Sequence, residues 1–290
     1  MTISIGVDTL CWHMRLEAAA ITLEQAFDDA ASLGAMAVVV NLHHARERTT
    51  AQLGQLASIA GSLGMRVLAS GDFVGSPRKG DVPAVGAERI DRWLEGAVAL
   101  GSPTLRLASG FYRADIAGQP EVIEAERRYV IDVLQLSASA ATGAGVRLIL
   151  ENHSDFTIDE YAAIVQEVGK DHVGVFLDLI NPIMTFDDPF RAISTLAPLA
   201  GSGHVRDYEL RSVQQPDEYH RRGFDVRYRY PGEGAAPIRA LLDALATTVG
   251  DRPYDLLVEG LDSRADVDDQ HDRLAQAMPL LRAMLEGDAA

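Results

Sequence analysis

Short apolar runs alternate along the whole chain with longer segments in which apolar residues recur every three or four positions. The first pattern is typical of strands buried on both faces, and the second of helices with one buried face. The apolar runs lie at residues 3–10, 36–42, 65–70, 104–110, 146–152, 173–179, 203–210 and 254–261. The periodic segments lie at residues 22–34, 49–64, 87–101, 124–145, 157–169, 188–201, 236–250 and 269–287. Eight strands, each followed by a helix, predict a (β/α)8 TIM barrel, with residues 1–290 forming a single α/β domain.

A doubly wound open sheet is the competing architecture, because it shows the same alternation of strand and helix. The turn after the first strand, DTLCWH, lacks the glycine-rich phosphate cradle of such folds. Ionisable residues also end four consecutive strands, which suits a closed ring better than a crevice at one switch point. Turn residues agree with the assignment: Thr50 is expected to cap a helix, and Gly34 and Gly64 to end two of them.

Charge and cysteine content narrow the functional classes. The formal net charge of −16 opposes binding to nucleic acid or anionic membranes, so we expect a small-molecule partner. The single cysteine, Cys11, excludes an intramolecular disulfide, and no apolar run approaches the roughly 20 residues that span a bilayer. The N-terminus lacks the pattern of a signal peptide, which predicts a cytoplasmic protein. The sequence leaves open whether the protein forms a homo-oligomer.

Four residues of the metal-ligand type stand at four successive strand ends: Glu151, Asp178, His204 and Glu259. Parallel strands of a barrel bring their carboxyl ends to one rim, where barrel enzymes have their active sites. Residues two apart share a face of a strand, so Glu151 is accompanied by His153, and His204 by Arg206.

Each of the four could instead cap loop amides, pair with Arg206 or be a hydrogen-bonded core histidine. As a set they favour a divalent cation, because ionised groups buried together are costly unless they share one. Three oxygen donors and one nitrogen suit Mn²⁺, Mg²⁺ or Co²⁺ better than a closed tetrahedral zinc site, and Mn²⁺ is the ion we expect.

These motifs resemble the xylose-isomerase-like barrels, which include sugar phosphate isomerases and epimerases. The resemblance covers nearly the whole chain and is clearest in ENH at 151–153, GVFLDLINP at 174–182, HVRD at 204–207 and VEG at 258–260. It implies that Glu151, Asp178, His204 and Glu259 bind the metal, and that Glu151 and Glu259 also form the acid–base pair. The expected activity is isomerisation or epimerisation of a sugar or oxidised sugar derivative through a metal-stabilised enediolate. Asn181 departs from the pattern, since ketose 3-epimerases of this family have a histidine there, and a plain ketohexose 3-epimerase becomes a weaker expectation.

Substrate contacts are expected from Arg206, His153, Asn181, His43 and Trp12. His43 and His44 end the second strand, and Trp12 and His13 follow the first. The long seventh loop, residues 209–234, adds Arg227 to a group of arginines that could bind a substrate carboxylate or phosphate, and Arg78 and Lys79 of the third loop lie on the same rim. The group in the seventh loop comprises Arg211, Arg221, Arg222, Arg227 and Arg229. A solvated surface loop or a subunit contact is the alternative for this segment.

Two enzymatic alternatives remain from the sequence. One is a metal-dependent decarboxylase or lyase acting on a 3-oxo sugar or sugar acid, and the other is carbon-glycoside cleavage together with a partner subunit. A non-enzymatic barrel that binds a ligand without metal is also open. A nuclease is disfavoured by the acidic charge and by the small number of ligands.

Overall fold

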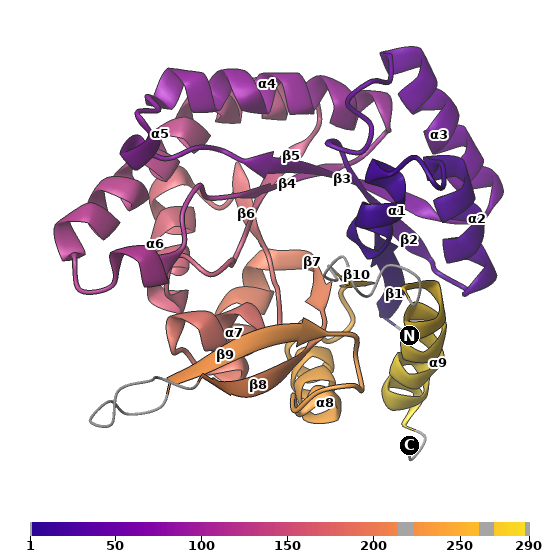
Figure 1. Cartoon of the computed structure of the whole chain (residues 1–290). Helices are drawn as coiled ribbons and strands as arrows, with labels where there is room; N and C mark the ends of the chain where they lie inside the picture. Colours follow the sequence, from indigo (N-terminus) through magenta and orange to yellow (C-terminus); the bar gives the residue numbers. More distant parts are fainter. Residues whose placement is uncertain (1, 214–222, 261–269, 288–290) are drawn as a thin grey trace.

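Eight parallel strands close into a barrel at the centre of the molecule (Figure 1). In this computed structural model, residues 2–213, 223–260 and 270–287 are described. The ring order is β1-β10-β7-β6-β5-β4-β3-β2, and pairing of β1 with β10, for example Ile5 with Leu256, closes it. The barrel strands are β1 (Ile3–Asp8), β2 (Ala37–Asn41), β3 (Arg66–Phe73), β4 (Thr104–Ala108), β5 (Arg147–Glu151), β6 (Val173–Phe176), β7 (Ala200–Val205) and β10 (Tyr254–Val258). The expectation of a closed ring rather than an open sheet is confirmed.

Helices cover the outside of the barrel. They are α2 (Leu23–Ser32), α3 (Thr50–Ser62), α4 (Pro83–Ala99), α5 (Pro120–Gly143), α6 (Ile158–Val168), α7 (Pro189–Leu196), α8 (Ile238–Val249) and α9 (Gln270–Glu286). Thr49, not Thr50, caps α3, because its side chain accepts from the Gln52 amide in a capping box. Gly34 and Gly64 follow helices with φ of 72° and 76°, which favours glycine. Within the described part of the chain, none of the helices is both long and apolar enough to cross a bilayer.

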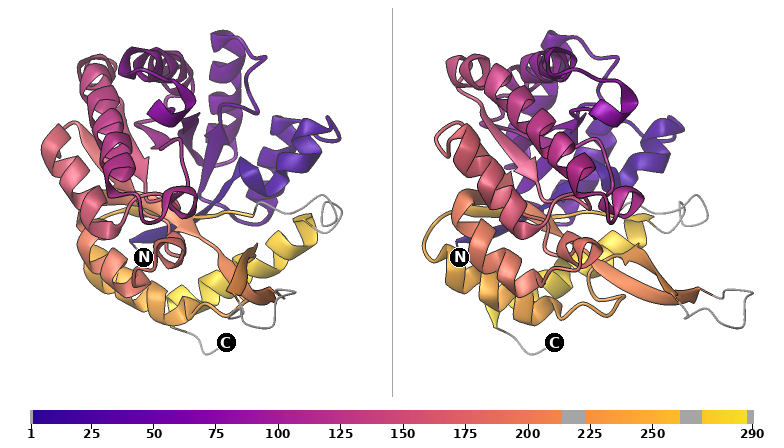
Figure 2. Two further views of the ribbon diagram at one scale, coloured as in Figure 1. Left: turned by 60° about the vertical axis from the view of Figure 1, so that its left-hand side comes forward. Right: turned by 90° about the vertical axis from the view of Figure 1, so that its left-hand side faces the viewer.

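The predicted strand at residues 203–210 is two strands in the structure. β7 ends at Val205, and β8 (Asp207–Val213) leaves the barrel to pair antiparallel with β9 (Gly223–Arg229). The buried Asp207 side chain accepts hydrogen bonds from the amides of Gly232, Gly234 and Ala236, which anchors the return of the chain at the barrel rim. The seventh loop is therefore largely a β-hairpin that extends beyond the ring of helices (Figure 2).

Short helices after several strands also escaped prediction. η1 (Thr9–Trp12) and α1 (His13–Glu17) follow β1, η2 (Pro77–Lys79) follows β3, η3 (Arg113–Ile116) follows β4, and η4 (Asn181–Thr185) follows β6. A further 3-10 segment, η5 (Ala197–Leu199), continues α7 within the helical segment predicted at residues 188–201. The η1 turn begins because Asp8 accepts a hydrogen bond from the Leu10 amide at 2.8 Å.

Two apolar layers explain why the strands have continuous apolar runs. The larger layer lies between strands and helices, and a small cluster formed by Ala37, Val39, Leu68, Ile149, Phe176 and Leu257 fills the barrel lumen. Each strand alternates between these two layers, so a side chain two positions beyond a lumen residue also faces the lumen. This alternation decides which side chains reach the rim of the lumen.

Candidate functional site

Glu151, Asp178 and Glu259 each follow a lumen residue by two positions: Ile149, Phe176 and Leu257. His204 in β7 packs edge-on against Phe176, with 4.6 Å between ring centroids. One ligand atom from each of Glu151, Asp178, His204 and Glu259 lies within 4.8 Å of the others, and all four residues are buried. The fold thus brings the four predicted residues to one point.

The His204 ring is held between carboxylates. Its Nδ1 lies 3.2 Å from Glu151 Oε1 and 3.5 Å from Glu259 Oε2, and its Nε2 lies 3.1 Å from Asp8 Oδ2. Burial by itself would lower the pKa of His204, but Glu259 and the hydrogen bonds to Asp8 and Glu151 outweigh it and raise that pKa to about 10. Asp8 therefore orients the ring and leaves Nδ1 facing the three acidic residues. A carboxylate behind a histidine in this way is typical of metal sites.

Two buried arginines surround the same point. Arg106 pairs with Glu151, and Arg206 lies 2.8 Å from Asp178 Oδ2 and 2.5 Å from Glu259 Oε2. Burial would raise the pKa of Glu151, yet Arg106 and His204 hold it well below its ordinary value, so this carboxylate is ionised at neutral pH.

The residues present fit a divalent cation. Asp178 Oδ2 and Glu259 Oε2 are buried without a hydrogen bond, although both lie at ion-pair distance from Arg206. The carboxylates of Asp8, Glu151, Asp178 and Glu259 and the guanidinium groups of Arg106 and Arg206 sum to two negative charges around the His204 ring. In the absence of a cation these charges keep His204 protonated; a divalent cation at Nδ1 would replace that proton and balance both charges.

The Asp178 carboxylate caps loop amides with one oxygen and faces the cluster with the other, two roles that the sequence presented as alternatives. Its Oδ1 accepts hydrogen bonds from the amides of Ile180 and Asn181, both at 2.7 Å, and so caps the loop amides at the start of the η4 turn. Its Oδ2 faces His204 and Arg206. Asn152 fixes this strand end by bonding both the amide and the carbonyl of Asp178. Capping of one oxygen therefore orients the other toward the site.

A cavity of about 320 Å³ opens above the cluster. Its lining includes Glu259, Arg106 and His153 together with His43 and His44 from the turn after β2. Aromatic walls come from Phe73 and Tyr112, which are 36% and 48% exposed and pack around His153 at centroid distances of 5.7 and 5.4 Å.

The other expected substrate contacts lie elsewhere in the described structure. Trp12 is fully buried in the hydrophobic core and does not line this cavity, because the η1 turn directs it inward while His13 faces the cavity. Asn181 is buried, and its Oδ1 accepts from Arg206 at 2.8 Å and from Tyr228 at 3.0 Å. Arg206 is itself engaged by Asp178 and Glu259. Arg206 thus contacts the cluster, Asn181 contacts Arg206, and neither residue lines the cavity.

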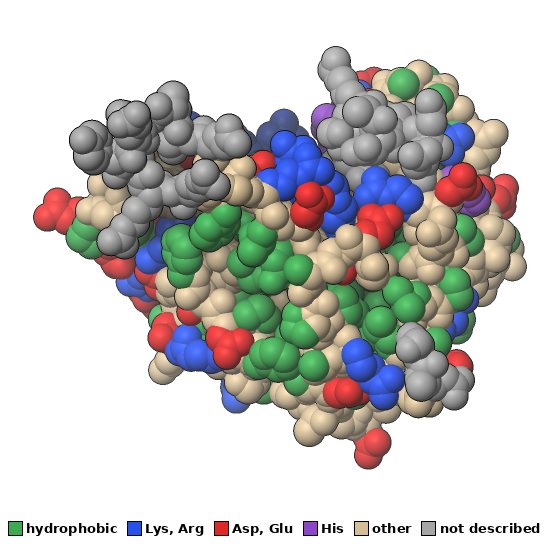
Figure 3. All heavy atoms as spheres, turned by 60° about the horizontal axis from the view of Figure 1, so that its bottom comes forward, with side chains coloured by type: hydrophobic (Ala, Val, Ile, Leu, Met, Phe, Trp, Pro, Cys, Tyr) green, Lys and Arg blue, Asp and Glu red, His purple; other side chains and the backbone are tan. Residues whose placement is uncertain are grey.

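The arginines of the hairpin are paired with acids on the hairpin itself. Arg227 lies 3.1 Å from Asp225, and Arg229 lies 2.7 Å from Glu209, which also pairs with Arg211. Arg221 and Arg222 lie outside the described residues. On the face in Figure 3, Lys and Arg side chains gather next to Asp and Glu side chains. In the third loop, Arg78 is exposed and Lys79 donates to the Gly110 carbonyl. In the described part of this hairpin, none of the arginines expected to bind a substrate carboxylate or phosphate lines the cavity.

Two residues of the cluster were missed from the sequence. Asp8 ends the first strand as the predicted ligands end theirs, and this shared position was the available signal. Arg106 is a charged residue inside the apolar run of β4, which indicates a buried partner. Their partners, His204 and Glu151, are far away in sequence, so these pairings could be identified only in the folded structure.

Comparison with known proteins agrees with this architecture. Residues 27–284 match the family described as xylose isomerase-like TIM barrel. A crystal structure of D-psicose 3-epimerase in the presence of D-fructose is 20% identical, covers 97% of this chain and 99% of that chain, and superposes with a TM-score of 0.72. The IOLI protein with a bound zinc atom is 16% identical, with 99% of each chain covered and a TM-score of 0.74. At these identities the similarity shows the fold alone.

A curated relative matches over a shorter region. The uncharacterized protein YihM of Escherichia coli (strain K12) is 24% identical over 177 residues, which is 61% of this chain. The match spans 49% of that relative, about half of its length.

Proposed function

The chain belongs to the xylose isomerase-like TIM barrel family, and we propose that it is a metal-dependent isomerase or epimerase of a sugar or oxidised sugar derivative. The observation that carries the proposal is the convergence of Glu151, Asp178, His204 and Glu259 beneath a cavity. The fold shared with a D-psicose 3-epimerase supports a carbohydrate substrate.

The two glutamates of the cluster, Glu151 and Glu259, are the proposed groups for proton transfer from and to the substrate. Glu151 stands on β5 and Glu259 follows β10, with β6 and β7 between them in the ring. Glu259 lines the cavity, while Glu151 lies below it with its pKa held low. One carboxylate removes the proton beside the substrate carbonyl, and the other delivers a proton to the deprotonated substrate, which gives the product. Each transfer contributes about 10² to 10⁴ in rate.

A divalent cation held by Glu151, Asp178, His204 and Glu259 would polarise the substrate carbonyl and its neighbouring hydroxyl. Mn²⁺ is our proposal from the donor set, with Mg²⁺ and Co²⁺ as alternatives. The chain's own contribution is the oriented His204 ring, the two arginines that hold the carboxylates, and the cavity wall. His153 and His43 line that wall, and we propose that they contact substrate hydroxyls.

Deuterium incorporation tests this proposal directly. The Mn²⁺-loaded protein is incubated in heavy water with a panel of ketoses and oxidised sugars, and the recovered sugars are analysed by NMR. We expect deuterium at the carbon beside the carbonyl, together with a new isomer. Glu151→Gln and Glu259→Gln should each reduce the rate by about 10² to 10⁴. The matched control is Glu88→Gln, because Glu88 is exposed on α4.

The alternatives give different results in the same experiment. A decarboxylase releases carbon dioxide from acidic 3-oxo sugars and forms no isomer from neutral ketoses, and a carbon-glycoside lyase requires an added partner subunit. A barrel that only binds a ligand shows neither wash-in nor an effect of Glu259→Gln beyond stability. Absence of wash-in with the whole panel, in protein that has bound metal, would refute the isomerase proposal.

A further inference from the structure

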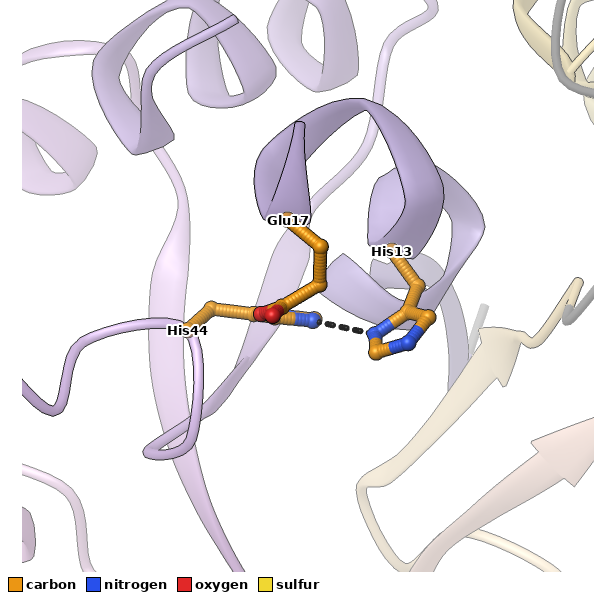
Figure 4. A group of neighbouring side chains, drawn as sticks. All are labelled: His13, Glu17 and His44. Atoms are coloured by element: carbon orange, nitrogen blue, oxygen red, sulfur yellow. Dashed lines mark hydrogen bonds between the residues drawn. The ribbon is translucent and has the colours of Figure 1, made fainter. Parts of the chain in front are cut away.

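A second group of metal-ligand type side chains lies at the outer edge of the cavity, apart from the buried cluster. His13 and Glu17 begin and end α1, so their spacing of four residues places them on one helical face. His44 approaches from the turn after β2 (Figure 4). One ligand atom from each of the three residues lies within 4.8 Å of the others. We propose that His13, Glu17 and His44 form a second metal site, selective for a borderline divalent cation such as Zn²⁺.

The spacing of the two imidazole nitrogens suits a shared cation. His13 Nδ1 lies 2.9 Å from His44 Nε2 in a hydrogen bond whose shared proton a bound cation would displace (Figure 4). Two nitrogens bound to one tetrahedral Zn²⁺ at about 2.0–2.1 Å would be roughly 3.3 Å apart, so a shift of a few tenths of an ångström accommodates the ion. Two histidines and one glutamate are also a known three-ligand set for zinc sites that keep an open position.

A hydrogen bond to the far side of the His44 ring fixes its orientation. His44 Nδ1 lies 3.0 Å from the hydroxyl of the buried Thr9, which holds the ring with Nε2 toward His13. A hydrogen bond to the remote ring nitrogen is the usual support of a metal-binding histidine.

The Glu17 carboxylate already contacts two other side chains, with which a bound metal would compete. Arg46 contacts its two oxygens at 2.9 and 3.3 Å, and His43 Nε2 lies 3.2 Å from Oε1. Glu17 is exposed, so water can replace a released contact at little cost. His43, with 44% of its side chain exposed, is close enough to provide a further ligand after a side-chain rotation.

The two sites should differ in the metals that they select. The buried cluster offers three carboxylates and one imidazole, whereas the outer group offers two imidazoles and one carboxylate. Nitrogen-rich sites favour Zn²⁺ over Mg²⁺ or Mn²⁺. Because His13, His44 and Glu259 line the same cavity, a cation at the outer site would face a substrate held above the inner site.

Metal stoichiometry tests the outer site. The full chain is equilibrated with Zn²⁺, dialysed and analysed for bound zinc per chain, alongside the double variant His13→Gln/His44→Gln. We expect the double variant to bind one equivalent fewer than the natural sequence. His172→Gln is the matched control, because His172 is exposed and lies in the turn between α6 and β6. Glu17→Gln should weaken the same equivalent by at least about tenfold.

Each outcome decides the inference without depending on the proposed function. If the buried cluster binds no zinc, the expected counts are one and zero rather than two and one, and the difference is unchanged. Equal stoichiometry in the natural and double-variant chains overturns the second site. Loss of an equivalent from His172→Gln as well would assign the zinc to surface histidines and also overturn it. Circular dichroism of the variants distinguishes loss of a site from loss of the fold.

Discussion

Replacing Asp8 by Asn removes the charge behind His204 while keeping an acceptor of the same shape. Asp8 Oδ2 lies 3.1 Å from His204 Nε2, and both side chains are fully buried. A hydrogen bond to a charged group contributes about 1.5–3 kcal/mol, and a neutral one about 1 kcal/mol. The variant should therefore lose about 1–2 kcal/mol of metal-binding free energy, or about 5- to 30-fold in Kd for Mn²⁺.

Isothermal titration of metal-free protein with Mn²⁺ measures this change. Asp72→Asn is the control, because Asp72 lines the same cavity and is exposed. It removes one negative charge near the mouth without contacting His204, so its Kd should change by less than about threefold. Equal weakening in both variants would show that Asp8 acts only through overall charge. An unchanged Kd in Asp8→Asn would refute the orienting role of Asp8.

Three further predictions test the fold and the site. Gly203→Ala should destabilise the protein by about 3 kcal/mol in urea unfolding, because its Cβ would lie 1.9 Å from the Leu177 carbonyl oxygen, whereas Gly201→Ala has open space and should be neutral. Arg48 donates a hydrogen bond to Glu24 at 2.9 Å, which lowers the pKa of Glu24 to about 2. The pair's contribution of about 1 kcal/mol or less to stability is therefore present above pH 4.5 and lost as the pH falls through 2. Glu24→Gln should flatten that part of the acid-unfolding curve, and an unchanged slope would count against the pair. Mn²⁺ at 100 times its Kd should stabilise the chelator-treated protein by about 2.7 kcal/mol, and no rise in Tm on adding metal would contradict a folded-state metal site.

The order of strands and helices was predictable because it depends on local patterns. Apolar runs and helical periodicity arise from burial on two faces or on one, and each is visible within a window of ten to twenty residues. The metal-ligand type residues were predictable for a related reason. Alternation along a strand places Glu151 on the same side as His153, and its position at a strand end predicted that it lies at the rim; the structure shows that this side faces the lumen, as Ile149 does.

Where the chain leaves this pattern, local signals were insufficient. The segment at residues 203–210 has the composition of one strand, but Asp207 is bonded to the amides of residues 232–236, and these bonds direct β8 out of the barrel. Local signals also failed to place Trp12, because the η1 turn directs its side chain into the core rather than into the cavity.

The sequence by itself determined which residues carry ionisable groups to the carboxyl ends of the strands, because chain order and strand alternation are local properties. Only the tertiary structure decided which of these groups meet. Asp8 and His204 are 196 positions apart, and they come within 3.1 Å because β10, which lies between β1 and β7 in the closed ring, joins the two ends of the chain. Ring closure is a non-local event whose pairings depend on packing across the whole barrel, and no short window of sequence contains that information.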